Sequence, residues 1–155
     1  MIEQIPVLKI GPVLMVSIQT ELHDRLAEEM QEAILQKLHE TGAPAVMIDI
    51  TALEMVDSFI GRVLSETAQM ARIMNTQVML VGMSPAVTMT LLEMGLEMPD
   101  IDTAVDIEAG LERLGFELRR IERRGKSRYP SEEINDANTG GPPDEAGKEA
   151  GDGND

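Results

Sequence analysis

The 155-residue sequence contains no cysteine. This absence excludes disulfide bonds, thiolate metal sites and a cysteine nucleophile. It is consistent with the reducing cytoplasm, where we expect the protein to reside. Aromatic residues are also few, namely Phe59, Phe116 and Tyr129, whereas methionine occurs twelve times. We therefore expect a core of aliphatic and thioether side chains, with most of the methionines inside it.

Basic residues are scarce relative to acidic ones, 13 against 28, which gives a formal net charge of -15. Residues 1 to 122 hold twenty acidic and eight basic side chains, a net charge of -12, so the acidity belongs mainly to this part. A negative protein repels nucleic-acid phosphate and anionic lipid, and we expect neither as a partner. No apolar run approaches the roughly 20 residues needed to span a bilayer.

Large apolar residues become rare after residue 122. From 123 to 155, Ile134 is the only aliphatic residue larger than alanine. Such a segment buries too little surface to offset the entropy lost on ordering. We therefore predict one folded domain at residues 1–122 and a disordered acidic tail at residues 123–155.

Strand and helix patterns alternate along the predicted domain. The candidate strands lie at residues 5–10, 13–18, 46–49, 77–81 and 103–105. The first two are joined by a Gly-Pro turn, which predicts an antiparallel hairpin at the edge of a sheet. The later strands alternate with helical patterns, which requires right-handed crossovers and largely parallel pairing. The predicted fold class is α/β, with a mixed four- to five-stranded sheet and about four helices.

Capping residues predict where the helices begin and end. Thr20 is the candidate N-cap of the first helix, which ends at Gly42. Ser84 precedes a proline, a pair typical of a helix start. Asp106 is expected to cap a last helix that extends to Ile121.

The segment 46–64 passes from a buried strand into a helix, and Ser58 stands at the transition. From Phe59 onward the apolar residues follow helical spacing. Loops beyond strand ends carry function in open α/β sheets, which makes Ser58 a candidate for modification or recognition. Asp57 and Ser58 are both typical N-cap residues, so a purely structural role for Ser58 is the alternative.

Motifs of catalysis and metal binding are missing from the sequence. Ser58 lies in VDSFIGR, which lacks the GxSxG spacing, and the sequence has no P-loop, GxGxxG or HExxH motif. His23 and His39 are sixteen residues apart without ligand spacing. Asp49 and Asp57 have no proton donor to pair with. We therefore predict a protein that is not an enzyme, with no metal and no cofactor.

Three segments carry a resemblance to a known family: VLMVSIQTELHD, IDITALEMVDSFIGRVL and PAVTMTLLEMGLEM. Together with the order of elements, they resemble the STAS domain of anti-sigma-factor antagonists, and within it the RsbS-type scaffold proteins of the stressosome. The resemblance spans about residues 3 to 118 and is most specific at DSFI. It implies a STAS fold in which Ser58 is phosphorylated by an RsbT-type serine/threonine kinase and dephosphorylated by an RsbX-type phosphatase. It also implies a homo-oligomer or dimer that joins RsbR-type paralogues in a large assembly, which sequesters the kinase until phosphorylation releases it.

The residues around Ser58 predict how a partner would sense this modification. A phosphate would add about two negative charges at a helix N-terminus, which favours anions. Arg62, one helical turn further on, is the nearest cation, whereas Asp57 opposes the phosphate. Phe59 is a candidate anchor at a partner interface. We expect Asp57, Phe59 and Arg62 to bind the partner, and phosphorylation of Ser58 to weaken that binding.

Three other functions stay open at this point. The first is a soluble antagonist of the SpoIIAA type, in which the same serine controls binding to an anti-sigma kinase. The second is a small-molecule or lipid binder, which requires an apolar cavity with convergent polar groups. The third is an enzyme that loses its activity when Ser58 is replaced with alanine.

Overall fold

The computed structural model describes residues 4–95, 98–117 and 119 of the chain. Within them the elements are β1 (Val7–Ile10), β2 (Val13–Ser17), α1 (Asp24–Thr41), β3 (Ala45–Asp49), α2 (Ser58–Ile73), β4 (Gln77–Val81), α3 (Pro85–Glu93), β5 (Ile101–Ala104) and α4 (Ile107–Arg113). The predicted tail at 123–155 lies outside the described residues. None of the described helices is both long enough and apolar enough to cross a bilayer.

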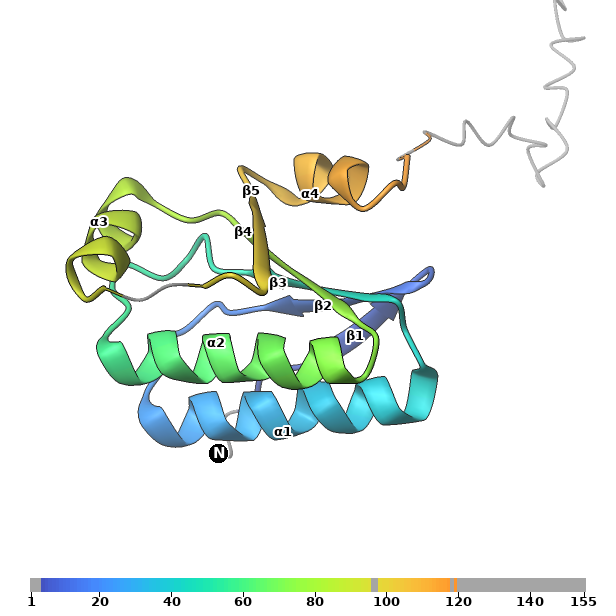
Figure 1. Ribbon diagram of the computed structural model, residues 1–155, viewed down its shortest axis with the longest axis horizontal. Helices are drawn as coiled ribbons and strands as arrows, with labels where there is room; N and C mark the ends of the chain where they lie inside the picture. Colours follow the sequence, from blue (N-terminus) through green and yellow to red (C-terminus); the bar gives the residue numbers. More distant parts are fainter. Residues whose placement is uncertain (1–3, 96–97, 118, 120–155) are drawn as a thin grey trace, which may run out of the picture. The chain divides into compact units, whose positions relative to one another are not determined.

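The five strands form one mixed sheet in the order β1-β2-β3-β4-β5 (Figure 1). β1 pairs with β2 in the antiparallel sense, and each of the remaining neighbours is parallel. The predicted edge hairpin and the predicted parallel sheet are therefore confirmed. The fold class is α/β, with five strands and four helices in the described part.

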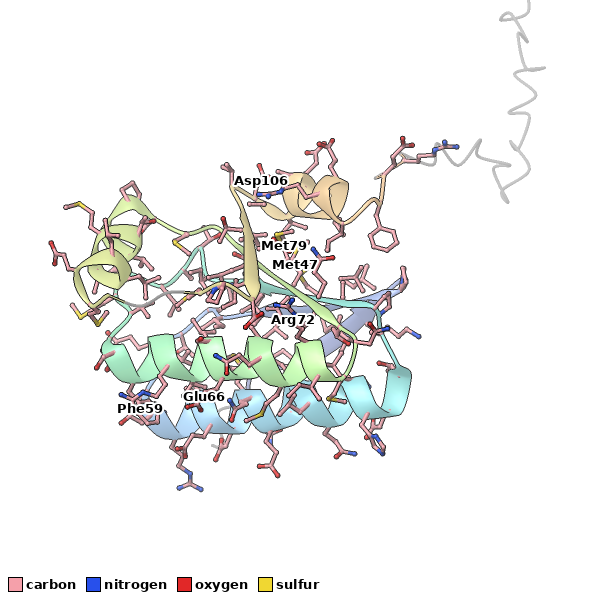
Figure 2. All side chains as sticks on the ribbon, in the orientation of Figure 1. Met47, Phe59, Glu66, Arg72, Met79 and Asp106 are labelled. Atoms are coloured by element: carbon pink, nitrogen blue, oxygen red, sulfur yellow. The ribbon has the colours of Figure 1, made fainter. Side chains whose placement is uncertain are left out.

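Two helical layers cover the sheet. α1 and α2 lie side by side over one face, where they enclose the larger apolar cluster (Figure 1). α4 covers β3, β4 and β5 on the other face. The smaller cluster lies there, and Figure 2 shows Met47 and Met79 between the sheet and α4. Alternate residues of the central strands therefore supply the two clusters, as expected for strands buried on both faces.

The predicted start of the first helix is wrong. α1 begins at Asp24, and its N-cap is His23, whose Nδ1 accepts a hydrogen bond from the Leu26 amide at 3.3 Å. The imidazole nitrogen takes the role usually filled by a side-chain oxygen. Residues 18–23 instead connect β2 to α1, so Thr20 lies before the helix. The predicted end is confirmed, because Gly42 adopts φ 62° and donates its amide to the Leu38 carbonyl.

The last helix is shorter than predicted. α4 begins after the cap Asp106, whose Oδ1 accepts from the Ala109 amide at 2.8 Å, as expected. It ends at Arg113, because Gly115 enters the left-handed region at φ 85° and donates its amide to the Glu112 carbonyl. Glycine adopts this conformation without steric cost and terminates helices for that reason. Ile121 lies outside the described residues.

The expectation that most methionines lie in the core is borne out in part: Met15, Met83, Met94 and Met98 are partly buried and pack against one of the two clusters. Only Met30, Met47 and Met79 are buried among the described ones. Met55 and Met89 are 77% and 61% exposed. Met55 lies in a connecting loop and Met89 on the short helix α3, and neither position is covered by another layer. Helical spacing alone did not show which faces would find a neighbour.

Candidate functional site

The connection from β3 to α2 begins with a local side-chain turn at the carboxyl edge of the sheet. Asp49 Oδ1 accepts hydrogen bonds from the Thr51 amide at 2.9 Å and from the Thr51 hydroxyl at 2.6 Å. The Ile50 amide donates to the Val81 carbonyl at 3.0 Å. These bonds tie the start of the connection to both β3 and β4. The Asp-x-Thr spacing is the sequence signal for this turn, in which Asp49 holds the backbone and is not a catalytic group.

Two buried side chains hold the middle of this connection. Leu53 and Val56 are 5% and 1% exposed and belong to the larger apolar cluster. The Leu53 amide donates to the Ile50 carbonyl at 2.9 Å and closes a turn. Glu54 and Met55, which lie between the two anchors, are exposed. The loop therefore has a fixed base and a solvent-facing tip directly before α2.

Asp57, and not Ser58, is the N-cap of α2. Its backbone is extended, and its Oδ1 accepts a hydrogen bond from the Ile60 amide at 2.8 Å. Its carbonyl accepts from the Gly61 amide at 2.9 Å. The Asp57 side chain thus satisfies an amide of the first turn that would otherwise lack a partner, and the Asp57 carbonyl accepts the first regular hydrogen bond of the helix. The alternative that Ser58 serves as the cap is wrong.

Ser58 is the first residue of α2 and is exposed to solvent. Within the described part of the chain, its hydroxyl takes part in no hydrogen bond. The hydroxyl is therefore accessible and is not needed to hold the loop. This geometry suits a residue that is modified or recognised by another protein.

The structure brings the other predicted partner-binding residues into the same turn region of α2. Asp57 and Arg62 are exposed, and among the described residues Arg62 forms no ion pair. Phe59 is half-buried against the larger cluster at the beginning of the helix (Figure 2). Part of the Phe59 ring is therefore used for folding, and only the remainder is available to a partner.

A groove of about 540 Å³ separates the β2–α1 connection from the loop before α2. Its apolar floor includes Leu22, Leu53 and Ile60, and Glu21, Glu54 and Asp57 contribute carboxylates to its lining. These carboxylates disfavour anionic ligands such as lipid headgroups. The groove therefore gives no support to an anionic lipid as a ligand.

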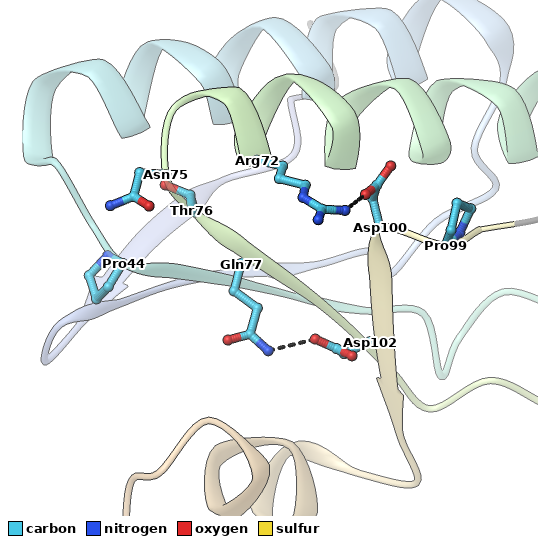
Figure 3. A pocket seen from close by; sticks show the side chains of 8 residues that line it. All are labelled: Pro44, Arg72, Asn75, Thr76, Gln77, Pro99, Asp100 and Asp102. Carbon is cyan, nitrogen blue, oxygen red and sulfur yellow. Dashed lines mark hydrogen bonds and ion pairs between the residues drawn. The ribbon is translucent and has the colours of Figure 1, made fainter.

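A second hollow, of about 470 Å³, lies at the opposite end of the parallel strands (Figure 3). Its two carboxylates are engaged: Asp100 pairs with Arg72, and Asp102 accepts from Gln77 Nε2 at 2.5 Å. Nowhere in the described ranges do three histidine, aspartate or glutamate side chains gather closely enough to hold a metal ion. This hollow lies at the amino-terminal end of β4. The loop that leads to Ser58 lies at the opposite, carboxyl-terminal end of the parallel strands.

Comparison with known proteins identifies the family. Residues 4–106 match the STAS domain. The structure of Moorella thermoacetica RsbS S58E is 34% identical, with a TM-score of 0.66, and the match covers 73% of this chain and 96% of that one. A chain from the stressosome, described as a signal integration and transduction hub, is 37% identical, with a TM-score of 0.63 and coverage of 71% and 96%.

A third relative is the RsbT co-antagonist protein RsbRA of Bacillus subtilis, which is 21% identical over 96 residues. The match covers 62% of this chain and 34% of that protein, so the chain spans about a third of its length. One solved relative is RsbS and the other is a stressosome chain, and this chain shares their STAS fold, which fits the prediction of a non-enzymatic protein. The match to the STAS domain at residues 4–106 includes all five strands and the Ser58 region, and the chain belongs to the STAS domain family.

Proposed function

We propose that this chain is a cytoplasmic scaffold protein of the stressosome that captures an RsbT-type serine/threonine kinase and releases it when Ser58 is phosphorylated. The observation that carries this proposal is the Ser58 hydroxyl, which lies exposed beside the Asp57 cap and forms no hydrogen bond to the part of the chain that the structure describes. The similarity to RsbS and to a stressosome chain supports it. In this function RsbR-type paralogues share the assembly, an RsbX-type phosphatase removes the phosphate, and the chain itself forms a homo-oligomer or dimer.

Phosphorylation of Ser58 is compatible with the folded state. The phosphate would sit at the N-terminus of α2, where unpaired amides and the helix dipole favour an anion by about 0.3 to 1 kcal/mol. The Asp57 carboxylate, one residue away, opposes this gain, and Arg62 lies within one turn to offset it. Because Asp57 holds the cap and Ser58 does not, the modification leaves the first turn of the helix intact.

The larger effect of the phosphate falls on a partner that covers this turn. An interface formed against a neutral hydroxyl would have to accommodate about two negative charges. Burying such a charge without a matched cation costs several kcal/mol, enough to release a bound protein. The RsbS relative was solved as S58E, a serine-to-glutamate change that places a negative charge on that protein.

The test is the affinity of the RsbT-type kinase for wild type, Ser58→Ala and Ser58→Asp, measured by titration calorimetry. We expect wild type and Ser58→Ala to bind alike and Ser58→Asp to bind at least about tenfold more weakly, a difference of about 1.4 kcal/mol. Ser65→Asp is the matched control, because it adds the same charge two turns further along α2. Equal affinity of all three position-58 proteins would contradict the proposal.

Incubation with the kinase and ATP, followed by phosphopeptide mass spectrometry, tests the modification itself. We expect phosphate on Ser58, and phosphate found only on other residues would overturn the assignment. Size-exclusion chromatography with an RsbR-type partner then tests the scaffold role. A very large complex supports the stressosome function, whereas a small complex with an anti-sigma kinase alone supports the SpoIIAA-type alternative.

A further inference from the structure

The turn after β4 approaches the Ser58 loop so closely that only glycine fits at residue 82. A Cβ atom at Gly82 would overlap the Thr51 hydroxyl and would lie 3.0 Å from Asp49 Oδ1 and 3.0 Å from Thr51 Cα. Gly82 also has φ 77°, in the left-handed region. The steric conflict involves backbone as well as side chain, so rotation of one flexible group cannot relieve it.

Thr51 has little freedom to move away from Gly82. Its amide and its hydroxyl both donate to Asp49 Oδ1, at 2.9 and 2.6 Å. The preceding amide, that of Ile50, donates to the Val81 carbonyl next to Gly82. Asp49, Thr51 and Gly82 therefore form a contact between the ends of β3 and β4, which we call the Thr51 clamp.

The Thr51 clamp fixes the first part of the loop that leads to Ser58. Beyond it, the buried Leu53 and Val56 hold the loop to the core, and Asp57 caps α2. Displacement of Thr51 would be transmitted along this short chain to Asp57 and Ser58. A kinase needs the attacking hydroxyl in a defined position, and a misplacement of about 1 Å can lower a rate by about a hundredfold.

We propose that Gly82 is a positioning residue for Ser58: through the Thr51 clamp it sets the conformation in which the loop presents the hydroxyl to the kinase. The kinase part of this inference rests on the proposed function. The positioning part concerns the loop alone and has its own readout. Gly82 would act without touching Ser58 or the transferred phosphoryl group.

The chain provides a matched control for the backbone conformation. Gly95 has φ 65°, and among the described residues nothing lies within 4 Å of an added Cβ. Gly82→Ala and Gly95→Ala therefore carry a similar left-handed strain, but only Gly82→Ala creates a steric conflict. A difference between the two variants in loop exchange or phosphorylation rate is therefore caused by the steric conflict at the Thr51 clamp and not by the backbone strain.

The experiment compares full-length wild type, Gly82→Ala and Gly95→Ala by hydrogen exchange of the 50–57 amides and by the initial rate of Ser58 phosphorylation at saturating kinase. We expect Gly82→Ala to speed amide exchange in this loop and to lower the phosphorylation rate by about tenfold to a hundredfold. Gly95→Ala should leave both unchanged. In Gly82→Ala, amides outside residues 50–57 should exchange as in wild type, whereas a general loss of stability would speed exchange throughout the domain.

Each failure has a distinct meaning. If wild type is not phosphorylated on Ser58, the proposed function fails, and loop exchange still decides the positioning role. If wild type is phosphorylated and Gly82→Ala matches Gly95→Ala in both measurements, the positioning role is overturned. Should Gly82→Ala not fold, Thr51→Ala alone removes the hydrogen bond from the Thr51 hydroxyl to Asp49 without adding bulk. Unchanged exchange of the loop in Thr51→Ala would then contradict the clamp.

Discussion

Asp57 and Ser58 divide two roles that either residue could fill by its chemistry. Both types accept hydrogen bonds from the amides of a first helical turn, so the sequence alone could not say which of them caps α2. The decision comes from Val56, whose buried side chain fixes the approach of the chain to the helix. With Val56 in the core, Asp57 has the extended backbone of a cap and Ser58 already belongs to the helix.

Replacing the cap should therefore affect stability more than replacing the serine beside it. Asp57→Ala removes the acceptor of the Ile60 amide and should lower the free energy of unfolding by about 1 kcal/mol. Asp57→Asn keeps an acceptor and should lose only part of this, and Ser58→Ala should be nearly neutral. Urea denaturation of the three variants provides the measurement. A loss in Ser58→Ala as large as in Asp57→Ala would show that the serine also caps the helix.

A helix could be predicted correctly where one short segment contains both its apolar pattern and the residue that begins or ends it. Ser84 before a proline correctly marked the start of α3, and Gly42 correctly marked the end of α1. Thr20 failed as a cap because residues before α1 serve to connect it to β2. The end of α4 failed because an apolar spacing continues past Gly115, where the backbone leaves the helix. Local patterns thus predicted which segments form helices and strands. Contacts between distant segments decided where several of the helices begin or end.

The short helix α4 depends on a close approach to the sheet at Gly110. A Cβ there would lie 2.8 Å from Met47 Cε and 2.9 Å from Val81 Cγ1. Gly110→Leu should therefore overpack this contact and lower the free energy of unfolding by about 1 to 3 kcal/mol. Glu108→Leu adds the same side chain at an exposed position of α4 and is the control. Equal stability of the two variants in urea denaturation would show that α4 can move away from the sheet without a loss in the free energy of unfolding.

α1 and α2 are joined by a polar contact within their apolar interface. The Thr67 hydroxyl is fully buried, donates to the Val63 carbonyl at 2.6 Å and accepts from Gln31 Nε2 at 3.1 Å. Thr67→Val keeps the shape but removes the acceptor, and should cost about 1 kcal/mol. Gln31→Met in the same protein should recover part of this loss, because neither partner is then left unpaired. A double-mutant cycle measured by urea denaturation checks this coupling. Strict additivity of the two changes in the free energy of unfolding would argue against it.

At the scale of the whole molecule, the sequence predicted the mixed sheet but not the contact that constrains its functional loop. The edge hairpin and the parallel strands followed from alternating patterns and the handedness of crossovers. Thr51 and Gly82 are thirty-one residues apart, and their contact exists only because β3 and β4 are neighbours that end at the same edge. Two residues that come into contact only because their strands are neighbours share no local sequence pattern. A single sequence therefore could not reveal this contact.

The excess of acidic side chains should make the stability of the folded chain depend on salt. The net charge of -12 on residues 1–122 produces repulsion that dissolved ions screen. We expect the melting temperature to rise by about 4 °C between low salt and about 0.5 M sodium chloride, which corresponds to about 1 kcal/mol for a domain of this size. Calorimetry or circular dichroism can follow the transition. A fall in melting temperature would mean that attractive pairs such as Arg25–Glu29 outweigh the repulsion.

One pair of like charges permits a direct check of this explanation. Glu28 and Glu32 are exposed and lie one turn apart on α1, an arrangement that costs about 0.2 to 0.5 kcal/mol. Glu28→Gln/Glu32→Gln should therefore melt at a higher temperature than wild type in low salt, and the difference should shrink as sodium chloride is added. If the difference persists unchanged at high salt, the gain comes from helix propensity or packing and not from relief of repulsion.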